Sequence, residues 1–214
     1  MATTRARKIL EYVMKTVPVN KKQDPSHKLK HILGVFRVGT TIGRKMHANM
    51  EVLEPALLLH DVVRPDNPML EKKHALLSSN RAKRILPSFG YTQKEINKIV
   101  HAISAHSRSS RREEPKTLEA EIVYDADKLD GLGVIGVARA RVLCSARGYD
   151  QKQTAKWYLD RIIDVAKNRS LYTQYGKRVA NSKVKASLDF CRSVLGKDCN
   201  KILVRKLGNT KLKM

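Results

Sequence analysis

Cysteine is scarce in this sequence of 214 residues, which has only three copies and no Cys-x-x-Cys pair. An odd number without that spacing excludes a disulfide framework and argues against a thiolate zinc site or a redox pair. The three positions are Cys144, Cys191 and Cys199. We therefore expect a protein of a reducing, intracellular compartment.

Acidic residues are also few, because 20 Asp and Glu stand against 43 Lys and Arg and leave a formal net charge of +23. Such an excess creates a positive potential that attracts phosphate-bearing molecules. Two interpretations stay open, a generally cationic surface and nonspecific nucleic-acid binding, because no recognised nucleic-acid motif accompanies the charge. The charge indicates an anionic partner without naming it.

Long apolar runs are absent as well, and no stretch approaches the ~20 residues of a membrane-spanning helix. The opening Met-Ala-Thr-Thr-Arg does not have the pattern of a signal peptide. We predict a cytoplasmic protein with no membrane partner. Aromatic residues make up only 5% of the chain, so aliphatic side chains must form its core.

The alternating valine-rich segments typical of strands are nearly absent, and helical periodicity dominates the chain. The predicted fold is all-α, a single-domain helical bundle of ordinary size. We predict a domain over 1–200, with its core at about 24–139 and C-terminal helices at about 151–196. Residues 201–214 hold five cations and no acid, and are predicted to be a basic tail.

A helix is predicted over about residues 24–46, because Asp-Pro at its start is typical of an N-cap followed by the first helical position. Val35 and Ile42 follow His31 at spacings of four and eleven residues. These spacings place all three side chains on one face of the helix. We therefore expect His31 to point into the interior.

The next predicted helices also carry histidine. A helix over about 52–63 is apolar nearly all round, which is typical of a central element, and His60 and Asp61 stand near its end. A helix over about 71–86 carries His74. These positions bring two further imidazoles and a carboxylate to the ends of predicted helices.

A fourth core helix opens with a capping box formed by Thr92 and Glu95. His106 extends its apolar face, seven residues after Ile99. His101 falls on the opposite face, toward solvent. Of these two histidines, we expect His106 to serve function.

Three acids follow on a helix predicted over about 118–129: Asp125, Asp127 and Asp130. Periodicity does not choose among them. Buried carboxylates and imidazoles without compensation cost several kcal/mol, and a bound divalent cation compensates them. The inward His31, the His60-Asp61 pair and the acidic cluster together predict a metal site.

The order of these residues, with Leu-Leu-Leu before His60-Asp61, resembles the HD superfamily of metal-dependent phosphohydrolases. The similarity covers about 24–139 and is most specific in the block that ends it, Tyr-Asp-Ala-Asp-Lys-Leu-Asp-Gly-Leu-Gly-Val-Ile-Gly-Val-Ala-Arg. That block resembles the bacterial and archaeal branch that includes nucleotide pyrophosphohydrolases. The resemblance implies an HD-type helical bundle that hydrolyses a phosphate ester or anhydride, with a nucleotide as the expected substrate.

Carried over by position, the resemblance implies four metal ligands: His31, His60, Asp61 and Asp127. Imidazole and carboxylate ligands suit Mn²⁺, Fe²⁺, Co²⁺ or Mg²⁺, whereas the absence of thiolates argues against a structural zinc. We expect Mn²⁺. In the implied mechanism, Asp61 or Asp130 orients the attacking water, and His74 or His106 acts as the acid to the leaving group or contacts phosphate or a second metal.

The substrate-binding residues are less well specified, because Gly34 stands where relatives often have a phosphate-binding arginine. We expect Arg37, Arg64 or the loop that begins at Arg108 to supply the missing charge, and His27 to contact the substrate.

Two alternatives remain at this point. The same order of residues also resembles HD proteins that hold two metals, including di-iron oxygenases. The net charge and the basic tail would also suit a nucleic-acid-binding protein that keeps a vestigial HD fold, which would show salt-sensitive binding without turnover. The oligomeric state cannot be predicted from the sequence.

Overall fold

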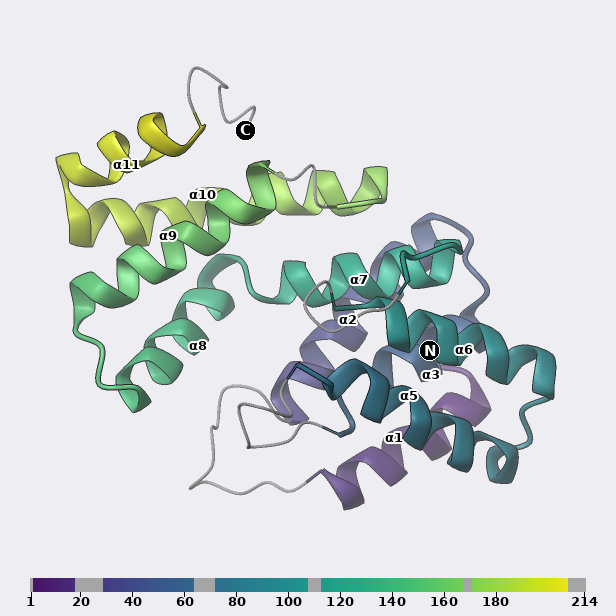
Figure 1. Cartoon of the computed structure of the whole chain (residues 1–214). Helices are drawn as coiled ribbons and strands as arrows, with labels where there is room; N and C mark the ends of the chain where they lie inside the picture. Colours follow the sequence, from purple (N-terminus) through teal and green to yellow (C-terminus); the bar gives the residue numbers. More distant parts are fainter. Residues whose placement is uncertain (1, 18–28, 64–71, 108–112, 168–170, 208–214) are drawn as a thin grey trace. The chain divides into compact units, whose positions relative to one another are not determined.

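The computed structural model describes residues 2–17, 29–63, 72–107, 113–167 and 171–207, and all regular structure in these ranges is helical (Figure 1). The all-α class is therefore confirmed. The chain divides into two compact units, Met1–Asp127 and Lys128–Met214. That the HD-type bundle forms one domain over 1–200 stays a prediction. Within the described part, no helix is both long enough and apolar enough to cross a bilayer.

The first unit is built around a central helix, α3. Its elements are α1 (Thr4–Thr16), α2 (Leu29–Lys45), α3 (Met50–Leu59), α5 (His74–Ile85), the 3-10 helix η1 (Leu86–Phe89), α6 (Gln93–Ala105) and α7 (Leu118–Asp130), which crosses the unit boundary. Helices α1, α2, α5 and α6 all pack against α3. Because Val52 to Leu59 are buried on every side, α3 forms the core and places its C-terminal end inside the unit.

Helix α2 lies close to α3 because two glycines, Gly39 and Gly43, occupy its contacting face. A Cβ at Gly39 would overlap the side chain of Leu57, and one at Gly43 would overlap that of Leu53. Glycine therefore permits a close helix-to-helix approach, and a larger residue at either position would force Leu57 or Leu53 to move. This approach brings His31 of α2 next to the end of α3.

We expect Gly39→Val to lower the melting temperature by about 3 to 10 °C, because overpacking a core typically costs about 1 to 3 kcal/mol. Thr41→Val is the matched control, since Thr41 lies on the exposed face of the same helix. Thermal unfolding followed by circular dichroism measures both variants. Equal melting temperatures for the two would contradict the close packing of α2 on α3.

Helix α1 was not predicted from the sequence, and one arginine joins it to the core. The Arg5 guanidinium lies 2.8 Å from the carboxylate of Glu51 in α3 and 2.6 Å from that of Glu95 in α6. The hydrogen bond from Arg5 is the main reason that the pKa of Glu95 falls to about 2. Glu95 also completes the predicted capping box with Thr92, which is confirmed.

The second unit contains α8 (Gly133–Ala146), α9 (Gln151–Lys167), α10 (Gln174–Leu195) and α11 (Lys197–Leu207). Helix α10 packs against the other three. The amphipathic helices expected over about 151–196 are confirmed by α9 and α10.

The predicted basic tail needs correction, because α11 extends through its first half to Leu207. Cys199 and Leu203, four residues apart, are both buried and give this helix an apolar face. The sequence did not predict this helix, because its apolar face is short and lysines are frequent around it. Residues 208–214 lie outside the described ranges.

Candidate metal centre

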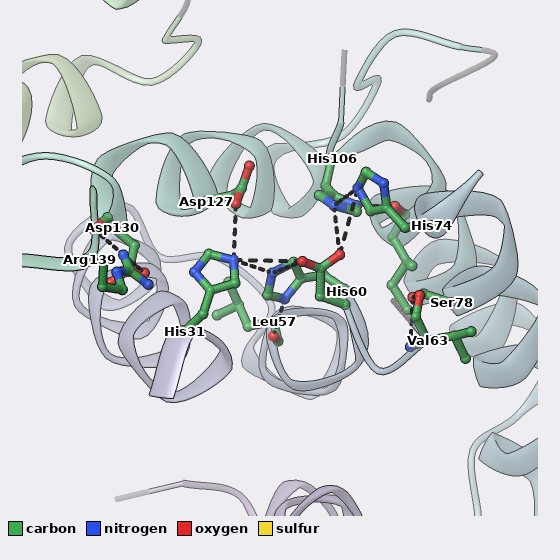
Figure 2. Close-up of polar contacts among 12 residues, drawn as sticks. His31, Leu57, His60, Val63, His74, Ser78, His106, Asp127, Asp130 and Arg139 are labelled. Atoms are coloured by element: carbon green, nitrogen blue, oxygen red, sulfur yellow. Dashed lines mark hydrogen bonds and ion pairs between the residues drawn. The ribbon is translucent and has the colours of Figure 1, made fainter. Parts of the chain in front are cut away.

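A compact cluster of imidazoles and carboxylates lies in the first unit, where the ends of several helices meet (Figure 2). It is formed by His31 of α2, His60 at the C-cap of α3, Asp61 directly after it, His74 at the start of α5, His106 at the C-cap of α6 and Asp127 of α7. The four histidines and Asp61 are at most 6% exposed. Residues that span almost a hundred positions of the sequence thus form one buried polar site.

The first part of the cluster is centred on His31. Its Nε2 lies 3.3 Å from Nε2 of His60 and 3.3 Å from Oδ1 of Asp127. The same nitrogen is 3.7 Å from Oδ2 of Asp61. Two imidazoles and two carboxylates therefore face one point, with their donor atoms turned toward one another.

Asp61 also faces the second part of the cluster. While Oδ2 is turned toward His31 and His60, Oδ1 lies 3.6 Å from Nε2 of both His74 and His106. The Nε2 atoms of His74 and His106 are 3.2 Å apart. One carboxylate thus lies between two pairs of histidines, with one oxygen toward each pair.

The orientation of two imidazoles is fixed by backbone carbonyls one turn earlier. Nδ1 of His60 lies 2.8 Å from the carbonyl oxygen of Leu57, and Nδ1 of His106 lies 2.6 Å from that of Ile103. A carbonyl oxygen can only accept, so both Nδ1 atoms donate, and a neutral ring then presents the lone pair of Nε2. Burial lowers the pKa of His60 to about 4, so this ring is neutral near pH 7.

The donor set suits divalent cations. Within each of two groups, His31, His60 and Asp61 or Asp61, His74 and His106, the potential ligand atoms lie within 4.8 Å of one another. Imidazoles with an Nδ1 hydrogen bond to a carbonyl have the arrangement common among metal-bound histidines. Nitrogen and oxygen donors without thiolate favour Mn²⁺, Fe²⁺, Co²⁺ or Mg²⁺ over a structural zinc. The residues therefore fit one ion in each group, with Asp61 shared.

The three acids of α7 have different surroundings. Asp127 is the one that contacts His31, and its side chain is 14% exposed. Asp130 belongs to the second unit, where its carboxylate pairs with the guanidinium of Arg139. A role for Asp130 in orienting water stays a prediction. In the structure, its carboxylate pairs with a cationic side chain, that of Arg139.

The predicted substrate-binding residues are not brought to the cluster by the described part of the structure. Arg37 lies on the exposed face of α2, while His31 lies on its buried face. His27, Arg64 and Arg108 lie outside the described residues. Their predicted contacts with substrate stay predictions.

His101 is less exposed than its place on the helical wheel indicated. Its Nδ1 is 3.0 Å from Oε1 of Glu113, and its Nε2 accepts a hydrogen bond from the backbone N–H of Lys116 at 3.0 Å. The hydrogen bond from His101 is the main reason that the pKa of Glu113 is lowered. His101 thus holds the segment before α7 through both of its ring nitrogens.

Sequence reasoning did not find the groups that hold the ligands in place. These include the carbonyl oxygens of Leu57 and Ile103, which any residue type could supply. They also include Ser78, whose hydroxyl contacts the backbone of Val63. The one available signal was the spacing of four residues between His74 and Ser78, which places both on one face of α5.

Comparison with known proteins gives a family match over the same region. The model of the HD domain family matches residues 29–132, a range that contains the whole cluster. The chain is 30% identical to the uncharacterized protein YpgQ of Bacillus subtilis over 139 residues, which are 62% of this chain and 66% of YpgQ. It is 32% identical to ribonuclease Y of Chloroflexus aurantiacus over 103 residues, 48% of this chain and only 18% of that enzyme.

Solved structures extend the likeness to both units. The crystal structure of Bacillus subtilis YpgQ in complex with ADP has a TM-score of 0.68 and 26% identity, covering 90% of this chain and 97% of that one. An HD superfamily hydrolase from an uncultured Thermotogales bacterium has a TM-score of 0.64 and 22% identity, covering 89% of this chain and 91% of that one. The second likeness shows the fold alone.

Proposed function

We propose that this chain, whose residues 29–132 match the HD domain family, is a metal-dependent phosphohydrolase that acts on a nucleotide. The observation that carries the proposal is Asp61, a buried carboxylate placed between two pairs of histidines. In a core with no function, burying four imidazoles beside one carboxylate would destabilise the fold, because each buried polar group costs free energy unless it is compensated. A catalytic metal centre accounts for all of them.

In the proposed reaction, His31, His60, Asp61 and Asp127 hold a divalent cation, with Mn²⁺ as the expected ion. Such a cation supplies a Lewis acid that polarises a phosphoryl oxygen and acidifies a water molecule. As one of these ligands, Asp61 would orient the attacking water. His74 or His106 would contact the phosphate or donate a proton to the leaving oxygen.

A nucleotide is the proposed substrate for two reasons. The excess of basic residues favours a substrate that carries phosphate. YpgQ, which is similar to this chain over nearly its whole length, has been crystallised in complex with ADP. Both observations support a phosphorylated small molecule as the substrate, and we propose that its phosphate faces the imidazoles of the cluster.

A second candidate substrate is a nucleic-acid strand. Lys30, Arg37 and Arg44 recur at seven-residue intervals on the exposed face of α2, the helix that carries His31 on its buried face. Cations along one helix face can follow a phosphate backbone and give salt-dependent binding. Several relatives of this chain are named ribonuclease Y, although the matched region covers only about a fifth of their length.

One experiment tests the proposal and separates the two substrates. The protein, freed of metal by a chelator, is incubated with a panel of nucleoside mono-, di- and triphosphates and with an oligoribonucleotide, with and without added Mn²⁺, and the products are identified. We expect phosphate release from a mononucleotide only when Mn²⁺ is present. Hydrolysis of the oligoribonucleotide alone would favour the second candidate. Binding of the oligoribonucleotide without turnover of any compound would contradict a hydrolase and favour a vestigial site.

A further inference from the structure

A buried serine links the helix that carries His74 to the turn that follows Asp61. Ser78 lies in α5 and is fully buried. Its hydroxyl accepts a hydrogen bond from the backbone N–H of Val63 and donates one to the carbonyl oxygen of the same residue, both at 3.2 Å. One side chain of α5 therefore satisfies both polar backbone groups of Val63 (Figure 2).

The segment that Ser78 holds contains the shared ligand. Val63 stands two residues after Asp61, in the turn that follows α3. Within that turn, the N–H of Val62 donates to the carbonyl of Leu59 at 3.2 Å. The turn leaves the helix directly at His60 and Asp61, so its path sets the direction of the Asp61 side chain. Ser78 fixes the end of this turn against another helix.

The same face of α5 carries a ligand of the second group. His74 precedes Ser78 by four residues, and residues at that spacing lie one above the other on a helix. Nε2 of His74 is 3.6 Å from Oδ1 of Asp61. Helix α5 is thus joined to the Asp61 turn at two neighbouring points, one through an imidazole and one through a hydroxyl.

We propose that Ser78 is a positioning residue that fixes the Asp61 turn to α5, so that one carboxylate can serve both groups of histidines. This inference rests on the proposed metal centre and names a determinant of its geometry. The Ser78 hydroxyl bonds to the backbone of Val63 and is not one of the proposed ligands. It acts through the backbone of Val63. A variant without the Ser78 hydroxyl keeps all the proposed metal ligands, but the position of Asp61 relative to His74 is no longer fixed.

The neighbouring serine provides a matched control. Ser79 is also buried in α5, but its hydroxyl donates to the carbonyl of Leu76, three residues earlier in the same helix, at 2.9 Å. Among the described residues, its hydroxyl has no hydrogen bond to the Asp61 turn. Removal of either hydroxyl deletes one oxygen from the same buried helix, so a general loss of stability should affect both variants. Only Ser78 should affect the metal centre.

The test uses Ser78→Ala, Ser78→Cys and Ser79→Ala in the full chain. Ser78→Cys keeps the volume of the side chain but has only a weak hydrogen-bond donor, and it replaces the alanine variant if that one does not fold. Mn²⁺ affinity is measured by calorimetry on metal-free protein, and thermal unfolding is recorded without metal. We expect both Ser78 variants to bind Mn²⁺ at least about tenfold more weakly than wild type, which corresponds to about 1.4 kcal/mol. The Mn²⁺ affinity of Ser79→Ala should stay within about twofold of the wild-type value.

The visible spectrum of the Co²⁺-loaded protein gives a second readout, because it reports ligand geometry. We expect it to change in Ser78→Cys and not in Ser79→Ala. Equal Mn²⁺ affinities and equal spectra for the Ser78 and Ser79 variants would overturn the inference. A wild-type protein that binds Mn²⁺ but hydrolyses nothing would overturn the proposed function alone. A wild-type protein that binds no divalent cation would overturn both.

Discussion

Asp61→Ala is expected to abolish both metal binding and hydrolysis. The change removes the carboxylate that faces His31 and His60 through one oxygen and His74 and His106 through the other. Both groups of ligands therefore lose an anionic member at once. The fold should persist, because α3 and its neighbours are held by aliphatic packing. Metal content, turnover and helical circular dichroism are measured on the same preparation.

Asp127→Ala gives an internal comparison for that result. Asp127 lies 3.3 Å from Nε2 of His31, in the first part of the cluster and not the second. We expect Asp127→Ala to bind a divalent cation more weakly at His31, His60 and Asp61. It should keep part of the metal binding that Asp61→Ala loses. Wild-type turnover in Asp61→Ala, in a preparation free of contaminating phosphatase, would contradict the assignment of the whole centre.

His106→Ala is expected to lower kcat/KM by about tenfold to a thousandfold, which corresponds to about 1.4 to 4 kcal/mol of transition-state stabilisation. The imidazole of His106 is 1% exposed and turns Nε2 toward Asp61 and His74. Its loss removes either a ligand or a contact with phosphate. Steady-state kinetics with saturating Mn²⁺ measures the effect.

His101→Ala is the control for that prediction, since His101 belongs to the same helix but contacts Glu113 and the backbone of Lys116. We expect a lower melting temperature from the loss of these contacts and a kcat/KM within about twofold of wild type. Equal losses of activity at His101 and His106 would contradict the assignment. A loss of stability alone at His106 would show that this imidazole merely fills the core.

Local sequence patterns predicted the elements that carry the ligands. The spacing of Val35 and Ile42 from His31 placed all three on the buried face of α2, where the structure has them. The apolar residues before His60 predicted a central helix, which is α3, and the capping box of Thr92 and Glu95 predicted the start of α6. Each of these predictions depends on interactions within a single helix or on which face of that helix is buried.

The features that the sequence did not reveal depend on contacts between distant segments. The choice of Asp127 among three nearby acids came from resemblance, because periodicity cannot show which acid meets His31. The link from Arg5 to Glu51 and Glu95 joins residues far apart in the chain, so α1 was missed. The contact of Ser78 with Val63 follows from how α5 packs and not from any local pattern.

The central claim is that the clustered histidines and aspartates form a metal centre, and titration of Mn²⁺ into metal-free wild-type protein tests it most directly. The electron paramagnetic resonance signal of free Mn²⁺ reports how much of the ion is bound at each step. We predict saturable binding of one or two ions per chain, lost in Asp61→Ala. If the signal of free Mn²⁺ in the presence of folded protein equals that in buffer alone at every step, no ion is bound and the metal centre is contradicted.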